Sequence, residues 1–367
     1  MASPLAARLV AAWPVALPVL SLLTLAATWG RYPGPLVVAV VALVLAGAVL
    51  AAVQHAEVIA HRLGEPFGSL VLAVAVTVIE VALIVTLMVS GGSETETLAR
   101  DTVFAAVMIT MNGIVGLSLL VGAVRFGISN FNPEGTGAAL ATVVSLATLS
   151  LVLPTFTASA SGPRFSPGQL AFAAVASLVM YAAFVLTQTY RHRDFFLPVT
   201  PDGSVAPAEV HADPPSARQA GTSLVLLLVA LVGVVGLAKV ESPSIEAGVK
   251  AAGFPNSFVG VVIALLVLLP ETLAAFRAAG RDRVQISLNL SYGSAMASIG
   301  LTIPAIAVAS IWLDGPLLLG LGSVQIVLLL LTAVVSILTV VPGRATRLQG
   351  AVHLVLFAAF LFLSISP

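Results

Sequence analysis

Long apolar stretches separated by short polar intervals dominate the pattern of this 367-residue chain. The stretch 66–90 is apolar throughout except for one carboxylate, Glu80, near its middle. At 1.5 Å per helical residue this stretch extends roughly 37 Å, which is longer than the ~30 Å hydrocarbon core of a bilayer. The pattern therefore predicts a membrane-spanning helix that carries Glu80 close to the midplane.

Eleven stretches of this kind are predicted along the whole chain. They cover residues 11–29, 35–54, 66–90, 101–124, 135–158, 168–190, 221–238, 257–277, 284–312, 316–341 and 348–366. The polar interval 191–220 holds five prolines and mixed charge, which is typical of a flexible linker. Composition supports the same interpretation, because 9% of residues are charged and soluble domains contain about 25%. The fold class predicted is an all-α polytopic membrane protein with eleven transmembrane helices.

The placement of arginine and lysine predicts the orientation of the chain. With the N-terminus in the cytoplasm, eleven of the 16 Lys and Arg residues fall in inside loops and five in outside loops. The positive-inside rule then predicts a multi-pass protein of the cytoplasmic (inner) membrane. Its N-terminus and linker would be cytoplasmic, and its C-terminus would lie outside.

Two of the predicted spans share an order of features. Phe67 precedes Glu80 by 13 residues, and Phe258 precedes Glu271 by 13 residues. By the count of spans, the two acid-bearing helices cross the membrane in opposite directions, which indicates two inverted five-helix repeats. The predicted division is an N-terminal extra helix at 1–30, a first repeat at 31–190, the linker at 191–220 and a second repeat at 221–367.

The two mid-span acids carry the functional hypothesis. Inverted repeats place matching residues about an axis in the membrane plane, so Glu80 and Glu271 are expected to meet near the centre. Two such carboxylates cannot both stay ionised and empty in a low-dielectric site, and they titrate as a coupled pair. Protons or a hard cation would neutralise them, so both residues are predicted metal ligands and proton carriers. Mutual exclusion between cation and protons predicts antiport.

Pro270 directly precedes Glu271. A proline inside a helix removes one backbone hydrogen bond and frees a carbonyl, as in the broken helices of transporters. The first repeat has Ile79 at the matching position, so a break is predicted in the second repeat alone.

Polar side chains on the helices that follow each acid are candidates for lining the site. Thr110 and Asn112 follow Glu80, and Ser291, Ser294 and Ser298 follow Glu271 on one helical face. Their oxygens would complete a coordination shell. The alternative is ordinary small-residue packing, with each hydroxyl bonded back to its own helix.

Histidines supply candidate regulatory groups. His55, Glu57 and His61 are predicted near the cytoplasmic end of the second span, and a pH or calcium sensor there is one interpretation. A solvated turn beside the membrane is the other. His353 lies several residues inside the last predicted helix, where it would relay protons or serve as a hydrogen-bonded structural residue.

With the two acids and the two halves in place, the chain resembles the cation/proton antiporters of the Ca2+/cation antiporter superfamily. The closest likeness is to bacterial ChaA-type calcium (sodium, potassium):proton antiporters. The similar stretches are HAEVIAHRLGEP at 55–66, VIEVALI at 78–84, PETL at 270–273, GSAMASIGLTIP at 293–304 and GAVHLVLFAA at 350–359. The resemblance implies an eleven-helix fold in which Glu80 and Glu271 bind the exchanged Ca2+, Na+ or K+ and the protons.

Departures from the wider exchanger pattern leave the transported ion open. The chain has Val76-Thr77 and Val267-Leu268 where that pattern has Gly-Asn ahead of each acid. Fewer oxygens near the site keep a monovalent Na+(K+)/H+ antiporter as the alternative to calcium exchange.

Other classes fit the sequence less well. A cation channel would require a continuous pore, and the single-chain inverted repeat argues against one. No His-Glu-x-x-His or Gly-x-Ser-x-Gly motif is present, so no enzyme is predicted. No resident cofactor is expected. The predicted partners are inorganic cations, protons and membrane lipid, with a homo-oligomer left open. Nucleic acid is not expected, because no basic patch is interleaved with aromatics.

Overall fold

The structure is a computed structural model that describes residues 4–31, 34–64, 67–91, 96–199, 214–312 and 315–366. It is built almost entirely of helices, as the apolar stretches predict. The chain forms two compact units, one from residues 1–91 and 211–252 and the other from 92–210 and 253–367. Each unit therefore joins segments from both sides of the predicted linker, of which residues 200–213 lie outside the described part. The division into two sequential repeats stays a prediction.

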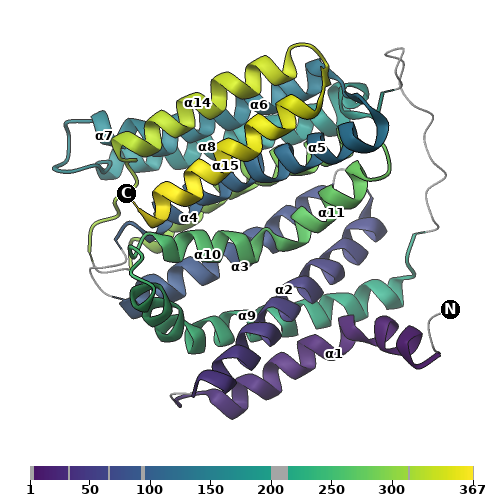
Figure 1. The fold of residues 1–367 in the computed structure, drawn as a ribbon. Helices are drawn as coiled ribbons and strands as arrows, with labels where there is room; N and C mark the ends of the chain where they lie inside the picture. Colours follow the sequence, from purple (N-terminus) through teal and green to yellow (C-terminus); the bar gives the residue numbers. More distant parts are fainter. Residues whose placement is uncertain are drawn as a thin grey trace. The chain divides into compact units, whose positions relative to one another are not determined.

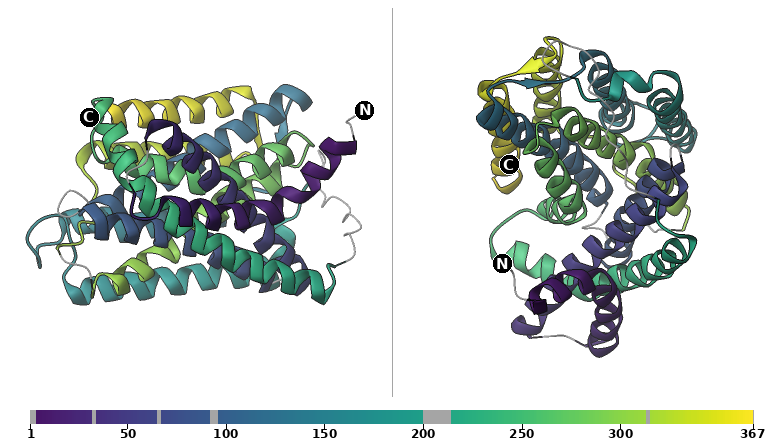
Figure 2. Two further views of the ribbon diagram at one scale, coloured as in Figure 1. Left: turned by 90° about the horizontal axis from the view of Figure 1, so that it is seen from below. Right: turned by 90° about the vertical axis from the view of Figure 1, so that its right-hand side faces the viewer.

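The first unit contains four helices, which are labelled in Figure 1. They are α1 (Pro4–Thr28), α2 (Pro35–Leu63), α3 (Phe67–Gly91) and α9 (Ala217–Ala251). Helix α2 packs against the other three, and α1 also runs along α9 (Figures 1 and 2). The unit thus assembles around α2 and α9, although some 150 residues separate these two helices in the sequence.

Small residues bring α1 and α9 together. An added Cβ at Gly233 would collide with the side chain of Ser21, and one at Gly236 with the side chain of Leu25. Glycine at these two positions allows the close backbone approach that is typical of helix pairs in membranes.

The second unit contains the remaining elements. Before the linker it has α4 (Leu98–Met108), η2 (Ile109–Ile114), α5 (Val115–Phe126), β1 (Ser129–Asn130), α6 (Pro133–Ala147), η3 (Thr148–Val152), α7 (Leu153–Phe156), α8 (Pro167–Leu186), η4 (Thr187–Arg191) and η5 (Arg193–Phe196). After the linker it has α10 (Phe258–Val267), α11 (Leu269–Ala279), α12 (Val284–Gly300), α13 (Thr302–Ala309), α14 (Ser323–Val340), β2 (Arg344–Ala345) and α15 (Arg347–Ile365).

Helix α12 has a central place in this second unit, where it contacts α5, α6, α8 and α11. The two short strands pair antiparallel, with Ser129 opposite Ala345, and tie the loop after α5 to the loop before α15 (Figure 2). Three segments, η2, η3 and η4, are single π-helical turns inside or at the end of longer helices.

Eight helices of the described residues are long and apolar enough to cross a membrane. The bent pair α10–α11 makes a ninth span if it is counted as one, and the shorter apolar helices Ala12–Thr28 and Ala73–Val89 come in addition. The protein is therefore an all-helical, multi-pass membrane protein. The predicted number of eleven spans stays a prediction.

Candidate functional site

Glu80 lies in the middle of α3, which runs without a break from Phe67 to Gly91. Its side chain is 2% exposed and shares the buried face of the helix with Val76, Leu83 and Leu87. Their spacing of three to four residues places these side chains in one row along the helix. Glu80 therefore points inward, as a functional acid in a membrane helix should.

Glu271 occupies a different local structure. Helix α10 ends at Val267, Leu268 connects, and α11 begins at Leu269 with a bend of 55°. Pro270 explains the bend, because it has no N–H to donate and its ring clashes with the preceding turn. Glu271 thereby falls in the first turn of α11, with its side chain 8% exposed. The break predicted from Pro270 is confirmed.

Thr110 and Asn112 lie in η2, the π-helical turn between α4 and α5. Both side chains are fully buried. The hydroxyl of Thr110 donates to the carbonyls of Ala106 and Val107, 2.8 and 3.0 Å away, so it bonds back to its own helix. A π-helical turn is rare in proteins and is often found at functional sites.

Asn112 is the centre of a buried polar network. Its amide nitrogen donates to Thr332 Oγ1 on α14 at 2.9 Å, and its Oδ1 lies 3.1 Å from Nδ1 of His353 on α15. The other ring nitrogen, Nε2, lies 3.2 Å from Thr339 Oγ1 on α14. With the amide in this orientation, Nδ1 carries the proton and Nε2 accepts from the threonine hydroxyl.

This network ties three helical segments of the second unit together. His353 is 0% exposed, and both of its ring nitrogens are bonded. Gly116 allows the close approach, because an added Cβ there would lie 2.9 Å from the Cβ of His353. Inside a membrane no bulk water satisfies an unbonded polar group, so a closed network of this kind fixes the packing.

The candidate serines on α12 differ in their surroundings. Ser291 is buried and donates to the carbonyl of Ser287 at 2.8 Å, whereas Ser287 donates to Ser118 on α5 at 2.5 Å. Ser298 is buried as well, and Ser294 is partly exposed. The hydroxyl of Ser291 is therefore bonded to its own helix, which is the alternative that the sequence analysis left open. A role for the five secondary residues in lining the site stays a prediction.

A comparison with known families decides the identity. The family model for the sodium/calcium exchanger protein matches residues 33–190 and 222–366, which together make up most of the chain. The chain belongs to the sodium/calcium exchanger protein family. The resemblance found in the sequence is thereby confirmed, and the chain is a membrane transporter rather than an enzyme.

Two relatives of this exchanger-family chain cover nearly its whole length. It is 46% identical to the putative ionic transporter y4hA of Sinorhizobium fredii, over 88% of this chain and 87% of the relative. It is 36% identical to the sodium-potassium/proton antiporter ChaA of Escherichia coli, over 94% of this chain and 93% of the relative.

Solved structures share the fold at low sequence identity. Native YfkE aligns with a TM-score of 0.73 at 15% identity, covering 97% of this chain and 99% of that one. The H+/Ca2+ exchanger CAX aligns with a TM-score of 0.67 at 16% identity, and the alignment covers 95% of this chain and 86% of the CAX chain. At this identity the likeness establishes the fold of the exchanger family and nothing more specific.

The three candidate regulatory residues near the end of α2, His55, Glu57 and His61, do not lie on one face of the helix. His55 is buried, while Glu57 and His61, one turn apart, lie on the exposed face. His55 Nε2 lies 2.8 Å from the carbonyl of Pro14 on α1, and Nδ1 lies 3.2 Å from Ser223 Oγ on α9. Pro18 has no N–H to offer that carbonyl, so His55 supplies the missing donor. A sensor role for these three residues stays a prediction.

Two buried acids received no role in the sequence analysis. Glu241 lies in α9, which continues through Pro243 to Ala251 although the apolar pattern predicts its end at Ala238. Its side chain is 2% exposed, and its Oε1 has no hydrogen-bond partner in the described part of the chain. Glu241 is therefore a buried helical acid that lies beyond the span predicted at 221–238. The proline and the charged residues after Lys239 hid the continuation of the helix.

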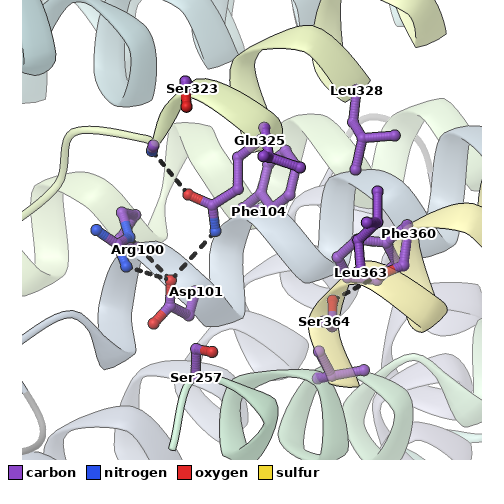
Figure 3. A pocket seen from close by; sticks show the side chains of 13 residues that line it. Arg100, Asp101, Phe104, Ser257, Ser323, Gln325, Leu328, Phe360, Leu363 and Ser364 are labelled. Atoms are coloured by element: carbon purple, nitrogen blue, oxygen red, sulfur yellow. Dashed lines mark hydrogen bonds and ion pairs between the residues drawn. The ribbon is translucent and has the colours of Figure 1, made fainter. Parts of the chain in front are cut away.

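Asp101 is the other buried acid, and it borders a cavity of about 280 Å³ within the second unit (Figure 3). Arg100 Nη2 lies 2.8 Å from its Oδ1, and the hydroxyl of Thr97 donates to its Oδ2 at 2.8 Å. Arg100 also donates to the carbonyl of Gly320 at 3.2 Å. The carboxylate is thus compensated, and the cluster fastens the start of α4 to the loop before α14.

No cluster of three His, Cys, Asp or Glu side chains that would hold a metal ion is found among the described residues. A cation bound at either predicted acid would therefore need further oxygens from hydroxyls, backbone carbonyls or water. Hydroxyls and backbone carbonyls occur throughout the chain, so the sequence marks the two acids more specifically than it marks Thr110, Asn112 or the serines of α12.

Proposed function

We propose that this protein is a secondary antiporter that exchanges Ca2+, Na+ or K+ for protons across the membrane. The observation that carries the proposal is the pair of inward-facing carboxylates, Glu80 and Glu271, at matching positions of two membrane helices. The 36% identity to a sodium-potassium/proton antiporter over nearly the whole chain supports it.

The chemistry follows from burial. A carboxylate inside a membrane protein costs several kcal/mol of free energy when it is charged and has no counter-charge. A proton removes the charge, and a hard cation compensates it through the carboxylate oxygens. Because a bound proton and a bound cation use the same oxygens, Glu80 and Glu271 hold one or the other. Transport then exchanges them as the site opens to each side in turn.

The choice of ion depends on the number of free oxygens. Ca2+ takes six to eight oxygen ligands. The hydroxyls of Thr110 and Ser291 donate to carbonyls of their own helices, which leaves their oxygen lone pairs for a cation, and Oδ1 of Asn112 lies 3.1 Å from Nδ1 of His353. The chain has Val76-Thr77 and Val267-Leu268 where the wider exchanger pattern has Gly-Asn, so it offers fewer side-chain oxygens ahead of each acid than that pattern does. This difference favours the second candidate function, a monovalent Na+(K+)/H+ antiporter with little calcium transport.

The proposed setting is the cytoplasmic membrane of a bacterium, with the N-terminus inside and the C-terminus outside. The excess of arginine in the predicted inside loops supports this orientation. The proposed partners are the transported cations, protons and lipid, without nucleic acid and without a resident cofactor. A homo-oligomer is compatible with the proposal and is not required by it.

Everted membrane vesicles test the function. Vesicles are acidified by respiration, and a pH-sensitive dye reports the proton gradient while Ca2+, Na+ or K+ is added separately. The proposal expects dequenching by at least one cation, which is absent from vesicles without the protein. No response to any of the three cations contradicts it. The cation that acts at the lowest concentration identifies the preferred ion.

A further inference from the structure

A groove of about 870 Å³ lies on the second unit, and neither Glu80 nor Glu271 lines it. One wall is α8 from Pro167 to Leu178, and the other is α13 with the residues after it, from Pro304 to Ile311. Apart from Arg164 and three serines, the groove is lined by apolar residues, mostly alanine, leucine, valine and proline, with Phe165 and Ile311. Its volume is in the range of small-molecule and cofactor sites.

Arg164 closes one end of this groove. Its side chain is partly buried, and its Nε has no hydrogen-bond partner in the described part of the chain. One hydrogen bond, from its Nη2 to Ser161 Oγ at 3.2 Å, holds the guanidinium. In the described part of the chain no carboxylate lies within ion-pair distance of it, in contrast to Arg100, which is paired with Asp101. The site therefore combines an apolar trough with an uncompensated, partly desolvated cation.

The dimensions of the groove match one leaflet of a bilayer. From Pro167 to Leu178, α8 rises roughly 16 Å, which is about half of the ~30 Å hydrocarbon core. Arg164 lies just before the start of this helix, where the membrane surface is expected for a spanning segment. The trough thus runs from the level of the headgroups toward the midplane, as an acyl chain does.

We propose that this groove binds one anionic phospholipid, with an acyl chain between α8 and α13 and its phosphate at Arg164. A guanidinium pairs well with phosphate because it offers several donors in a fixed plane. An unpaired guanidinium beside an apolar groove between membrane helices is therefore complementary to an anionic headgroup with its acyl chain. Since α13 follows α12 in one span, a lipid in the groove supports the second part of this span against α8.

Native mass spectrometry of the purified, full-length protein in detergent tests this proposal. Phosphatidylglycerol and phosphatidylcholine with identical chains are added separately, and sn-glycerol 3-phosphate is added as a chainless probe. The expected result is at least fivefold more phosphatidylglycerol than phosphatidylcholine adduct, and no adduct with the chainless probe. Arg164→Ala should lower the phosphatidylglycerol adduct to the phosphatidylcholine level, and Arg164→Lys should retain part of the preference.

The apolar half of the site has a matched pair of variants on α8. Ala174→Phe fills the groove, whereas Ala182→Phe adds the same ring at an exposed position outside it. Adducts with both lipids should fall several-fold in the first variant and stay unchanged in the second. Thermal melting without added lipid checks that each variant is folded.

Three results would overturn the proposal. Equal binding of the two lipids by the wild-type protein shows that Arg164 does not select for an anionic headgroup. Unchanged phosphatidylglycerol adducts in both Arg164→Ala and Ala174→Phe show that lipid binds elsewhere. A dimer that Ala174→Phe abolishes, without any loss of lipid, shows that a second copy of the chain occupies the groove.

Discussion

The two acid-bearing segments are matched in sequence and built differently in space. Glu80 lies in the middle of the uninterrupted helix α3, whereas Glu271 lies in the first turn of α11 after a 55° bend. The residue before each acid accounts for the difference, because Ile79 continues a helix and Pro270 ends one. The first segment thus presents its acid from a continuous helix, and the second presents it just after a bend.

The bend changes the surroundings of the acid. The first turn of a helix has backbone N–H groups without intrahelical partners, and their dipoles favour a negative charge nearby. A break also frees backbone carbonyls, which are cation ligands in transporters. The segment around Glu271 therefore offers backbone donors and acceptors, while the continuous helix α3 offers side chains only, the carboxylate of Glu80 and the buried hydroxyl of Thr77. We expect the second segment to contribute more to ion coordination.

Removing either carboxylate should have the largest effect. Glu80→Gln and Glu271→Gln keep the size of the side chain and remove its charge. Each is expected to lower cation-driven proton flux by more than about 100-fold, since a neutral amide neither carries the proton nor compensates the cation. The dye assay in everted vesicles measures the flux, and immunoblots check expression. Substantial exchange in either variant contradicts a mechanism with two carboxylates.

Replacing the proline before Glu271 tests whether the bend between α10 and α11 is needed for transport. Pro270→Ile copies the first repeat and is expected to straighten α10–α11, lowering exchange by roughly tenfold, or about 1.4 kcal/mol of barrier. Leu269→Ile is the matched control, because it adds a β-branched residue next to an intact proline. If Pro270→Ile transports as well as the control, the bend is not part of the mechanism.

The buried network around Asn112 is expected to affect stability more than the ion preference. Asn112→Leu removes the acceptor of the Nδ1–H of His353, at a cost of about 1–3 kcal/mol, while the hydroxyl of Thr332 keeps its contact with Sδ of Met108. The melting temperature in detergent should fall by roughly 4–8 °C. Thr142→Val, an exposed hydroxyl bonded to its own helix, is the control. An unchanged melting temperature would show that the network is not structural.

Removing the hydrogen bonds of His55 in the first unit should lower the melting temperature by less. His55→Leu removes the donor to the carbonyl of Pro14 and the partner of Ser223, at a cost of about 1–2 kcal/mol. The melting temperature should drop by a few degrees, and limited proteolysis should cut sooner within α1. His61→Ala, at an exposed position of the same helix, should change neither result. Equal behaviour of the two variants would remove His55 from the packing of α1.

The family resemblance came from five similar stretches between residues 55 and 359. The helical membrane fold was predicted from long apolar stretches, and the break in the second acid-bearing span was predicted from Pro270. These last two features are local, because each follows from the length of a segment or from the chemistry of one residue. The sequence also raised the alternative that Ser291 and Thr110 bond to their own helices, and both do so in the structure.

The remaining features depend on contacts between distant segments. The pairing of α2 with α9, and of His55 with the carbonyl that Pro18 leaves unbonded, joins residues far apart in the chain. The π-helical turn at Asn112 arises from tertiary packing, and no propensity scale marks it. Glu241 was missed because a proline and two charged residues follow it, although α9 continues through them.

Proton release on cation binding tests the central claim most directly. The purified protein is placed in weakly buffered detergent solution with a pH dye, and Na+, K+ or Ca2+ is added. Competition at shared carboxylates predicts that the wild-type protein releases protons with a saturable dependence on the transported cation. Glu80→Gln and Glu271→Gln should each release fewer. Saturable cation binding without proton release in the wild-type protein would contradict the account.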